Sequence, residues 1–69
     1  MKIRYFTDTD TMYIELNDRF VAETREINEN TLIDLDADGA LVAITVEHAR
    51  DTTDLSEFSL HQVVSQAAS

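Results

Sequence analysis

Polar and apolar residues alternate along most of the first 48 positions, which is the period of a β-strand with one apolar face. The alternating runs are residues 2–6, 12–16, 20–27, 31–36 and 41–47, the run at 20–27 being the weakest. They are separated by clusters of turn-forming residues at 7–10, 17–19, 28–30 and 38–39. This pattern predicts five short strands joined by short turns, and therefore an antiparallel meander.

The first two runs fit one register. A four-residue turn over 7–10 sets Ile3 opposite Ile14 and Tyr5 opposite Met12, so that apolar pairs share one face. A slip of one residue would move each set to the other face. The sequence therefore predicts a first hairpin with these pairs.

The last two strands are predicted to meet at Asp38-Gly39, which contains the only glycine of the chain. Asp-Gly favours a two-residue type I′ turn, in which both central residues have positive φ. The resulting pairs are Leu35 with Val42 and Ile33 with Ile44.

One face of the predicted sheet is apolar, and the other is mixed. The apolar face is expected to contain Ile3, Tyr5, Met12, Ile14, Leu16, Ile33, Leu35, Val42, Ile44 and Val46. The far face of the last hairpin is expected to carry Asp34, Asp36, Leu41, Ala43 and Thr45. The C-terminal region or a second subunit is expected to cover Phe6, Tyr13, Leu32 and Leu41.

The C-terminal region has a different period. At about 100° per residue, Leu60, Val63, Val64 and Ala67 share a face, which predicts a helix over 59–67. The alternative is a short sixth strand that contains Phe58 and Leu60. The predicted fold class is mainly β (α+β), an antiparallel five-stranded meander with a short C-terminal helix. We expect residues 1–69 to form a single small domain, with strands within 2–48 and a turn and the C-terminal helix within 51–67.

Composition adds constraints on assembly and partners. A 69-residue chain without cysteine has a small core and no disulfides, so we expect a homo-oligomer, most simply a dimer. A net charge of −9 repels nucleic acid and anionic lipid and attracts basic proteins. No apolar run is long enough for a signal peptide or a membrane span, so we expect a soluble, cytoplasmic protein.

The acidic stretch before Gly39 is a candidate calcium loop. Asp34, Asp36 and Asp38 occupy the first, third and fifth positions of an EF-hand-like loop, and Gly39 occupies the sixth. Position twelve is Thr45 instead of glutamate, and the flanks are rich in strand-forming residues. We therefore interpret the stretch as a hairpin turn and expect no metal ion or other cofactor.

Catalytic patterns are weak. Asp8 and Asp10 share a turn, where aspartate carboxylates bond to nearby backbone amides. Ser59 and His61 are two residues apart on the predicted helix, so they would not face each other. His48 is interpreted as structural, and no catalytic constellation is predicted.

Several of these segments together resemble a known family. They are Ile3-Arg4-Tyr5, Asp10, Tyr13-Ile14-Glu15-Leu16, Ile33 to Gly39, Leu41 to Val46, and Ala49. The pattern resembles the short bacterial and archaeal proteins of domain of unknown function 2283, over residues 1 to about 50. Members of that family usually have Gly-Ile-Glu-Ile after the Asp-Gly turn, where this chain has Ala43-Ile44-Thr45-Val46. The resemblance implies a fold without an established activity, and an antitoxin-like role, because similar proteins are sometimes encoded beside toxin-like genes.

Two functional hypotheses follow. The first is a small acidic, non-catalytic and oligomeric interaction module that binds a basic protein partner. The alternative is a binder of a small ligand or divalent metal that uses the Asp34/Asp36/Asp38 face with Tyr13 or Thr45.

Overall fold

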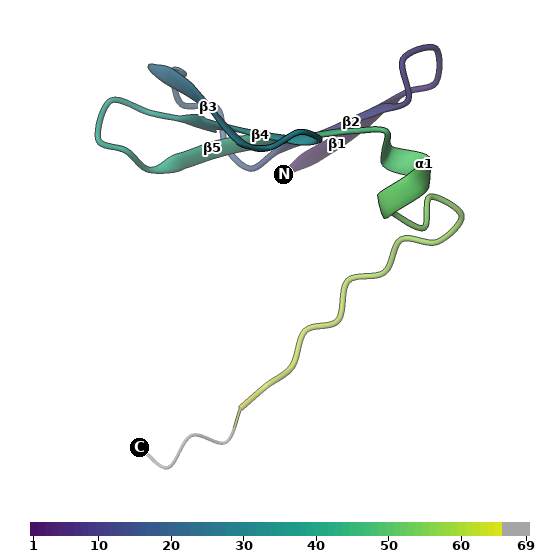
Figure 1. Ribbon diagram of the computed structural model, residues 1–69. Coiled ribbons are helices and arrows are strands. Elements are labelled where there is room, and N and C mark those ends of the chain that lie inside the picture. The colour runs from purple at the N-terminus through teal and green to yellow at the C-terminus, as the bar shows by residue number, and fades with distance from the viewer. Residues whose placement is uncertain (66–69) are drawn as a thin grey trace.

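The computed structural model describes residues 1–65 as one open sheet followed by a short helix and an extended segment (Figure 1). The elements are β1 (Lys2–Phe6), β2 (Thr11–Glu15), β3 (Glu23–Asn28), β4 (Thr31–Leu35), β5 (Leu41–Glu47) and α1 (Ala49–Thr52). All neighbouring strands are antiparallel. The predicted five-stranded antiparallel sheet with a single short helix is confirmed. No helix within residues 1–65 is long and apolar enough to cross a bilayer.

The strand order is β1-β2-β5-β4-β3, so the sheet is not a simple meander in sequence order. The loop over residues 17–22 carries the chain from β2 to β3 past the β4–β5 hairpin. Three contacts hold the loop there: Asn17 Nδ2 to the Leu41 carbonyl at 3.1 Å, Arg19 to Asp36 at 3.2 Å, and the Ala22 amide to the Leu35 carbonyl at 2.8 Å. β5, the last strand within residues 1–65, is therefore the central one, and β1 and β3 form the edges.

The register of the β1–β2 hairpin is the predicted one. Ile3 pairs with Ile14 and Tyr5 with Met12, on either side of the turn over residues 7–10. Asp10 closes this turn with φ of 54°, in the left-handed region that aspartate tolerates better than most residues. Apolar matching across the strands and an aspartate able to adopt this conformation together explain the register.

The β4–β5 turn differs from the predicted type I′ turn. The Gly39 amide donates to the Asp36 carbonyl at 3.0 Å and the Asp36 amide to the Ala40 carbonyl at 2.8 Å, which makes a three-residue loop of 37–39. Gly39 has φ of 83°, whereas Asp38 is not among the residues with positive φ. This is the hairpin in which a type I turn is followed by one left-handed glycine.

The longer loop moves the predicted pairs near the turn. Leu35 pairs with Leu41 instead of Val42, and a β-bulge after this pair restores the register, so that Ile33 pairs with Ile44 as predicted. Leu41 therefore does not belong with Asp34 and the other residues predicted for the far face. The bulge accommodates the extra residue without turning the isoleucines over.

The C-terminal helix predicted over 59–67 is wrong over residues 59–65, which are extended, and residues 66 and 67 lie outside the described part. The alternative sixth strand is not present within residues 1–65 either. The helix of the structure is instead α1, a single turn directly after β5. Short helices depend on close packing for their stability, and Figure 1 shows the segment extending away from the sheet, with Leu60, Val63 and Val64 largely exposed. The third strand is also shorter than predicted, because Phe20 and Val21 precede β3 and are exposed.

The core is very small. Within residues 1–65 only four apolar side chains are buried: Leu35, Val42, Ala43 and Ala49. Two of them, Val42 and Ala43, are neighbours in β5 and so lie close to opposite faces, which fits a central strand. Most apolar residues of the sheet are only half-buried.

Candidate functional site

One face of the sheet carries a continuous set of apolar side chains. Directly paired residues share a face, and the pairs Ile3–Ile14, Ile14–Ile44 and Ile44–Ile33 form one row across four strands. A second row runs beside it from Tyr5 through Met12 to Val46. We call this surface the apolar face and define it as Ile3, Tyr5, Met12, Ile14, Ile33, Ile44 and Val46. All seven were predicted for this face.

A groove lies along the β1–β2 half of the apolar face. Its volume is about 580 Å³, and its walls are mainly apolar. The floor comes from the sheet, and the opposite wall comes from the segment after α1. The lining residues are Met1, Ile3, Tyr5, Met12, Ile14, Thr53, Asp54, Leu55, Glu57, Phe58 and Leu60. Either the C-terminal region or a second subunit was predicted to cover Leu32 and Tyr13 on the other face, and the groove shows that the C-terminal region lies on the apolar side.

Asp10 anchors the end of β5 and α1 to the first turn. Its backbone carbonyl accepts the Ala49 amide at 3.0 Å, and its carboxylate accepts the Arg50 amide at 3.1 Å. The same carboxylate accepts the Tyr5 hydroxyl at 2.6 Å and lies 3.8 Å from Arg50 Nε. His48, with φ of 54°, reverses the chain just before the helix. This anchor fixes where the C-terminal segment leaves the sheet.

The hydrogen bonds and charges of the anchor shift the pKa values of Asp10 and Tyr5. The hydrogen bond from Tyr5 lowers the pKa of Asp10, and the Arg50 amide and guanidinium act in the same direction. The same bond raises the pKa of Tyr5 above its ordinary value. Asp10 is therefore held as a carboxylate at neutral pH, in a structural role. The backbone bond expected of a turn aspartate is present, but it reaches a residue 40 positions away.

The opposite face of the sheet brings together part of the predicted ligand-binding set. Tyr13 pairs with Thr45, and the Tyr13 hydroxyl donates to Asp34 at 3.4 Å. Thr24 Oγ1 donates to the other oxygen of Asp34 at 2.8 Å. Partial burial, followed by the charge of Asp34, raises the pKa of Tyr13. Both Asp34 oxygens therefore have donors from the same chain.

Asp36 and Asp38 do not join Asp34 in a site. One oxygen of Asp36 accepts the amides of Asp38 and Ala40, each at 2.9 Å, and its other oxygen faces Arg19. The Ala40 amide is the main cause of the lowered pKa of Asp36. Among residues 1–65 no group of three or more His, Cys, Asp or Glu side chains is arranged to hold a metal ion. The acidic stretch is built as a turn.

Most cationic side chains of the protein form ion pairs within the chain. Each of the four arginines forms an ion pair with a carboxylate of the same chain. The pairs are Arg4–Glu15, Arg19–Asp36, Arg25–Glu23 and Arg50–Asp10. Because the chain has 14 acidic residues, most carboxylates remain uncompensated at the surface. The surface field is therefore negative and favours basic partners.

Ser59 and His61 contact each other, although the predicted helix would have kept them apart. Because their segment is extended, residues two apart point to the same side, and His61 Nε2 lies 3.2 Å from Ser59 Oγ. Both side chains are exposed. A serine hydrolase also needs a group that orients the base and an oxyanion site. The contact alone does not make a catalytic site.

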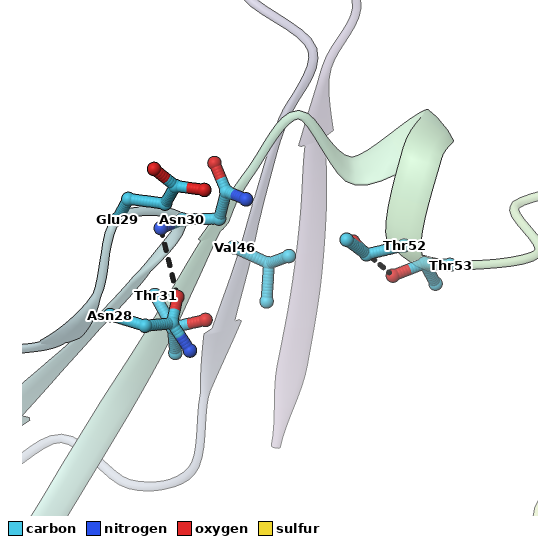
Figure 2. Close-up of a pocket in the computed structure, with 7 residues that line it drawn as sticks. All are labelled: Asn28, Glu29, Asn30, Thr31, Val46, Thr52 and Thr53. Carbon is cyan, nitrogen blue, oxygen red and sulfur yellow. Dashed lines mark hydrogen bonds between the residues drawn. The ribbon is translucent and has the colours of Figure 1, made fainter.

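A second hollow of about 390 Å³ lies between the β3–β4 turn and α1 (Figure 2). Two of its polar pairs bond locally, since Asn28 accepts the Asn30 amide at 2.8 Å and Thr52 contacts Thr53 at 3.4 Å. Figure 2 shows Val46 of the apolar face between these two groups. The hollow therefore forms a polar boundary of the apolar face.

Sequence reasoning missed two features of this surface. Leu60 was predicted on a helix or, with Phe58, in a sixth strand, and neither side chain was predicted to lie at a groove with β1 and β2. The anchor between Asp10 and Arg50 has no local signal, because it joins segments 40 residues apart.

Comparison with known proteins adds a family. The model of a family described as "Protein of unknown function (DUF2283)" matches residues 2–50. No curated protein and no solved structure matches the chain. The matched region ends within α1, so it contains the whole sheet and the anchor but not the segment after the helix.

Proposed function

The chain belongs to the DUF2283 family of proteins of unknown function, and on that premise we propose that it is a non-catalytic interaction module that self-associates through its apolar face. The observation that supports this most strongly is the open row from Ile3 to Ile33, which crosses four strands with only half-buried side chains at its centre. A continuous exposed apolar patch of this kind is typical of an interaction site.

The shape of the chain supports self-association. Its radius of gyration is 14.5 Å, compared with roughly 11 Å for a compact domain of this length, because the sheet is open and the C-terminal segment extends away from it (Figure 1). A chain this small gains stability when a second copy covers its apolar surface. We therefore propose a homo-oligomer, most simply a dimer. We also propose that it acts in the cytoplasm.

Light scattering of the full chain at micromolar concentration tests self-association. We expect twice the chain mass of 7.8 kDa. Ile44→Lys, at the centre of the apolar face, should give monomer, because it places a charge in the interface. Thr45→Lys is the matched control, since it adds the same charge to the same strand on the opposite face. A monomeric native chain, or equal effects of the two variants, would contradict the proposal.

We further propose that the acidic surface of the oligomer binds a basic protein, in an antitoxin-like role. The support is the net charge of −9 together with the internal pairing of all four arginines. Co-purification from the native host should recover a basic protein at low salt and lose it as salt screens the charges. Recovery of no basic protein would count against this part. The divalent-metal alternative has less support, because Asp34 and Asp36 already accept donors from their own chain.

A further inference from the structure

The C-terminal segment, residues 53–65, contains the most exposed large apolar side chains near the apolar face. Phe58 is 71% exposed and Leu60 is 80% exposed, although both line the groove. Val63 and Val64, farther along, are also exposed. Figure 1 shows the segment leaving α1 and extending away from the sheet. An apolar segment and an apolar face thus lie on the same side of one chain without burying each other.

The segment reaches only half of the apolar face. The residues opposite the segment in the groove belong to β1 and β2, apart from Met1 just before β1, and neither Ile33 nor Ile44 lines that groove. The other half of the apolar face, on β4 and β5, does not line this groove. Because the Asp10 anchor fixes the start of the segment at the β1–β2 end, the uncovered half needs cover from elsewhere.

The exposed area is large enough for a dimer interface. The chain exposes 5602 Å², whereas a compact monomer of 7.8 kDa exposes about 4,400 Å². The excess of roughly 1,200 Å² exceeds the roughly 800 Å² that each partner of a standard interface buries. A second copy would supply an apolar segment for this apolar face, and an apolar face for this segment.

From these observations we infer that the C-terminal segment is a dimerisation arm, in which the apolar side chains of Phe58, Leu60 and Val64 of one copy pack on Ile33 and Ile44 of a second copy. The exchange is reciprocal, as in a two-fold dimer. This inference rests on the proposed self-association and adds which parts of the two copies meet.

Disulfide trapping tests the exchange directly, because the natural chain has no cysteine. Chains carrying Leu60→Cys and chains carrying Ile44→Cys are mixed and oxidised, and peptide mapping should find positions 60 and 44 linked between copies. Leu60→Cys mixed with Thr45→Cys is the control and should give little of the corresponding link, since position 45 is on the opposite face. In the double variant Leu60→Cys/Ile44→Cys at low concentration, a link within one chain would overturn the exchange.

A second measurement uses the dimer dissociation constant of the full chain by analytical ultracentrifugation. Phe58→Ser/Leu60→Ser should weaken the dimer by at least about a hundredfold, because two large apolar side chains are no longer buried. The control Ser59→Ala/Gln62→Ala alters the same segment without removing large apolar side chains and should change it less than about threefold. A dimer that both variants leave unchanged would overturn the arm and leave the proposed self-association intact. A native chain that is only monomeric would overturn both.

Discussion

Replacing Gly39 by alanine isolates the conformational requirement of the β4–β5 turn. Gly39 has φ of 83°, and a Cβ added there would meet no atom within 4 Å. Steric clash with neighbours therefore contributes nothing, and only the backbone conformation opposes the substitution. A left-handed conformation costs an L-residue about 1–2 kcal/mol. Alanine also restricts the unfolded chain, which offsets about 0.4–1 kcal/mol of that cost.

The net expectation is a loss of about 1 kcal/mol of unfolding free energy, or a fall of about 4–8 °C in Tm for a domain of this size. Thermal unfolding followed by circular dichroism measures it, with every variant at the same concentration because self-association shifts Tm. Gly39→Asn should lose less, since asparagine enters the left-handed region more readily.

Asp38→Gly distinguishes the observed loop from a two-residue type I′ turn. In the three-residue loop Asp38 has an ordinary negative φ, so glycine there should be neutral or slightly destabilising. A type I′ turn would need positive φ at both positions, and glycine would then stabilise the hairpin. A gain of stability in Asp38→Gly, or a Gly39→Ala variant that melts with the native chain, would refute the reasoning.

Three other predictions concern the acidic groups. Asp10→Asn should speed amide exchange at Arg50 without unfolding the sheet, because the anchor loses its charge; unchanged exchange by NMR would contradict this role. The folded-state pKa values of Asp10 and Asp36 are lowered, so their contribution to stability is complete above the unfolded value near 4 and is lost as pH falls through the folded values. Urea unfolding should therefore show a decline below about pH 4 that weakens in Asp10→Asn, and an identical profile in the two proteins would argue against the assignment. Millimolar calcium should leave Tm unchanged, because Asp34 and Asp36 are engaged within the chain, and a rise of several degrees would show that they bind the ion.

Alternation of polar and apolar residues was sufficient to predict strands, faces and one complete register. Ile3 and Ile14 could be paired from sequence because a one-residue slip would expose both. The order of strands could not be obtained in this way, since alternation defines faces and not neighbours. The adjacent apolar residues Val42 and Ala43 were the available signal, because a strand buried on both faces is central.

For the C-terminal segment, the spacing of apolar residues was not sufficient to predict the structure. Leu60, Val63 and Val64 have helical spacing, but spacing produces a helix only where a surface receives the stripe. The segment instead remains extended, where alternation of Phe58 and Leu60 with polar residues is the relevant pattern. The sequence therefore predicted the strand residues of the groove, but not the wall that the C-terminal segment forms.

The central position of β5 has a consequence for how the sheet is assembled. Three of the four strand pairings join strands that are consecutive in the chain and can form as local hairpins. The fourth, between β2 and β5, is the single seam that joins β1–β2 to the three-stranded unit of β3, β4 and β5. Closing it must bring Glu15 to Ala43, so its loop-closure entropy opposes the step and should make it late in folding. Until that seam closes, the isoleucine row is divided, and neither half presents a complete face to a second copy.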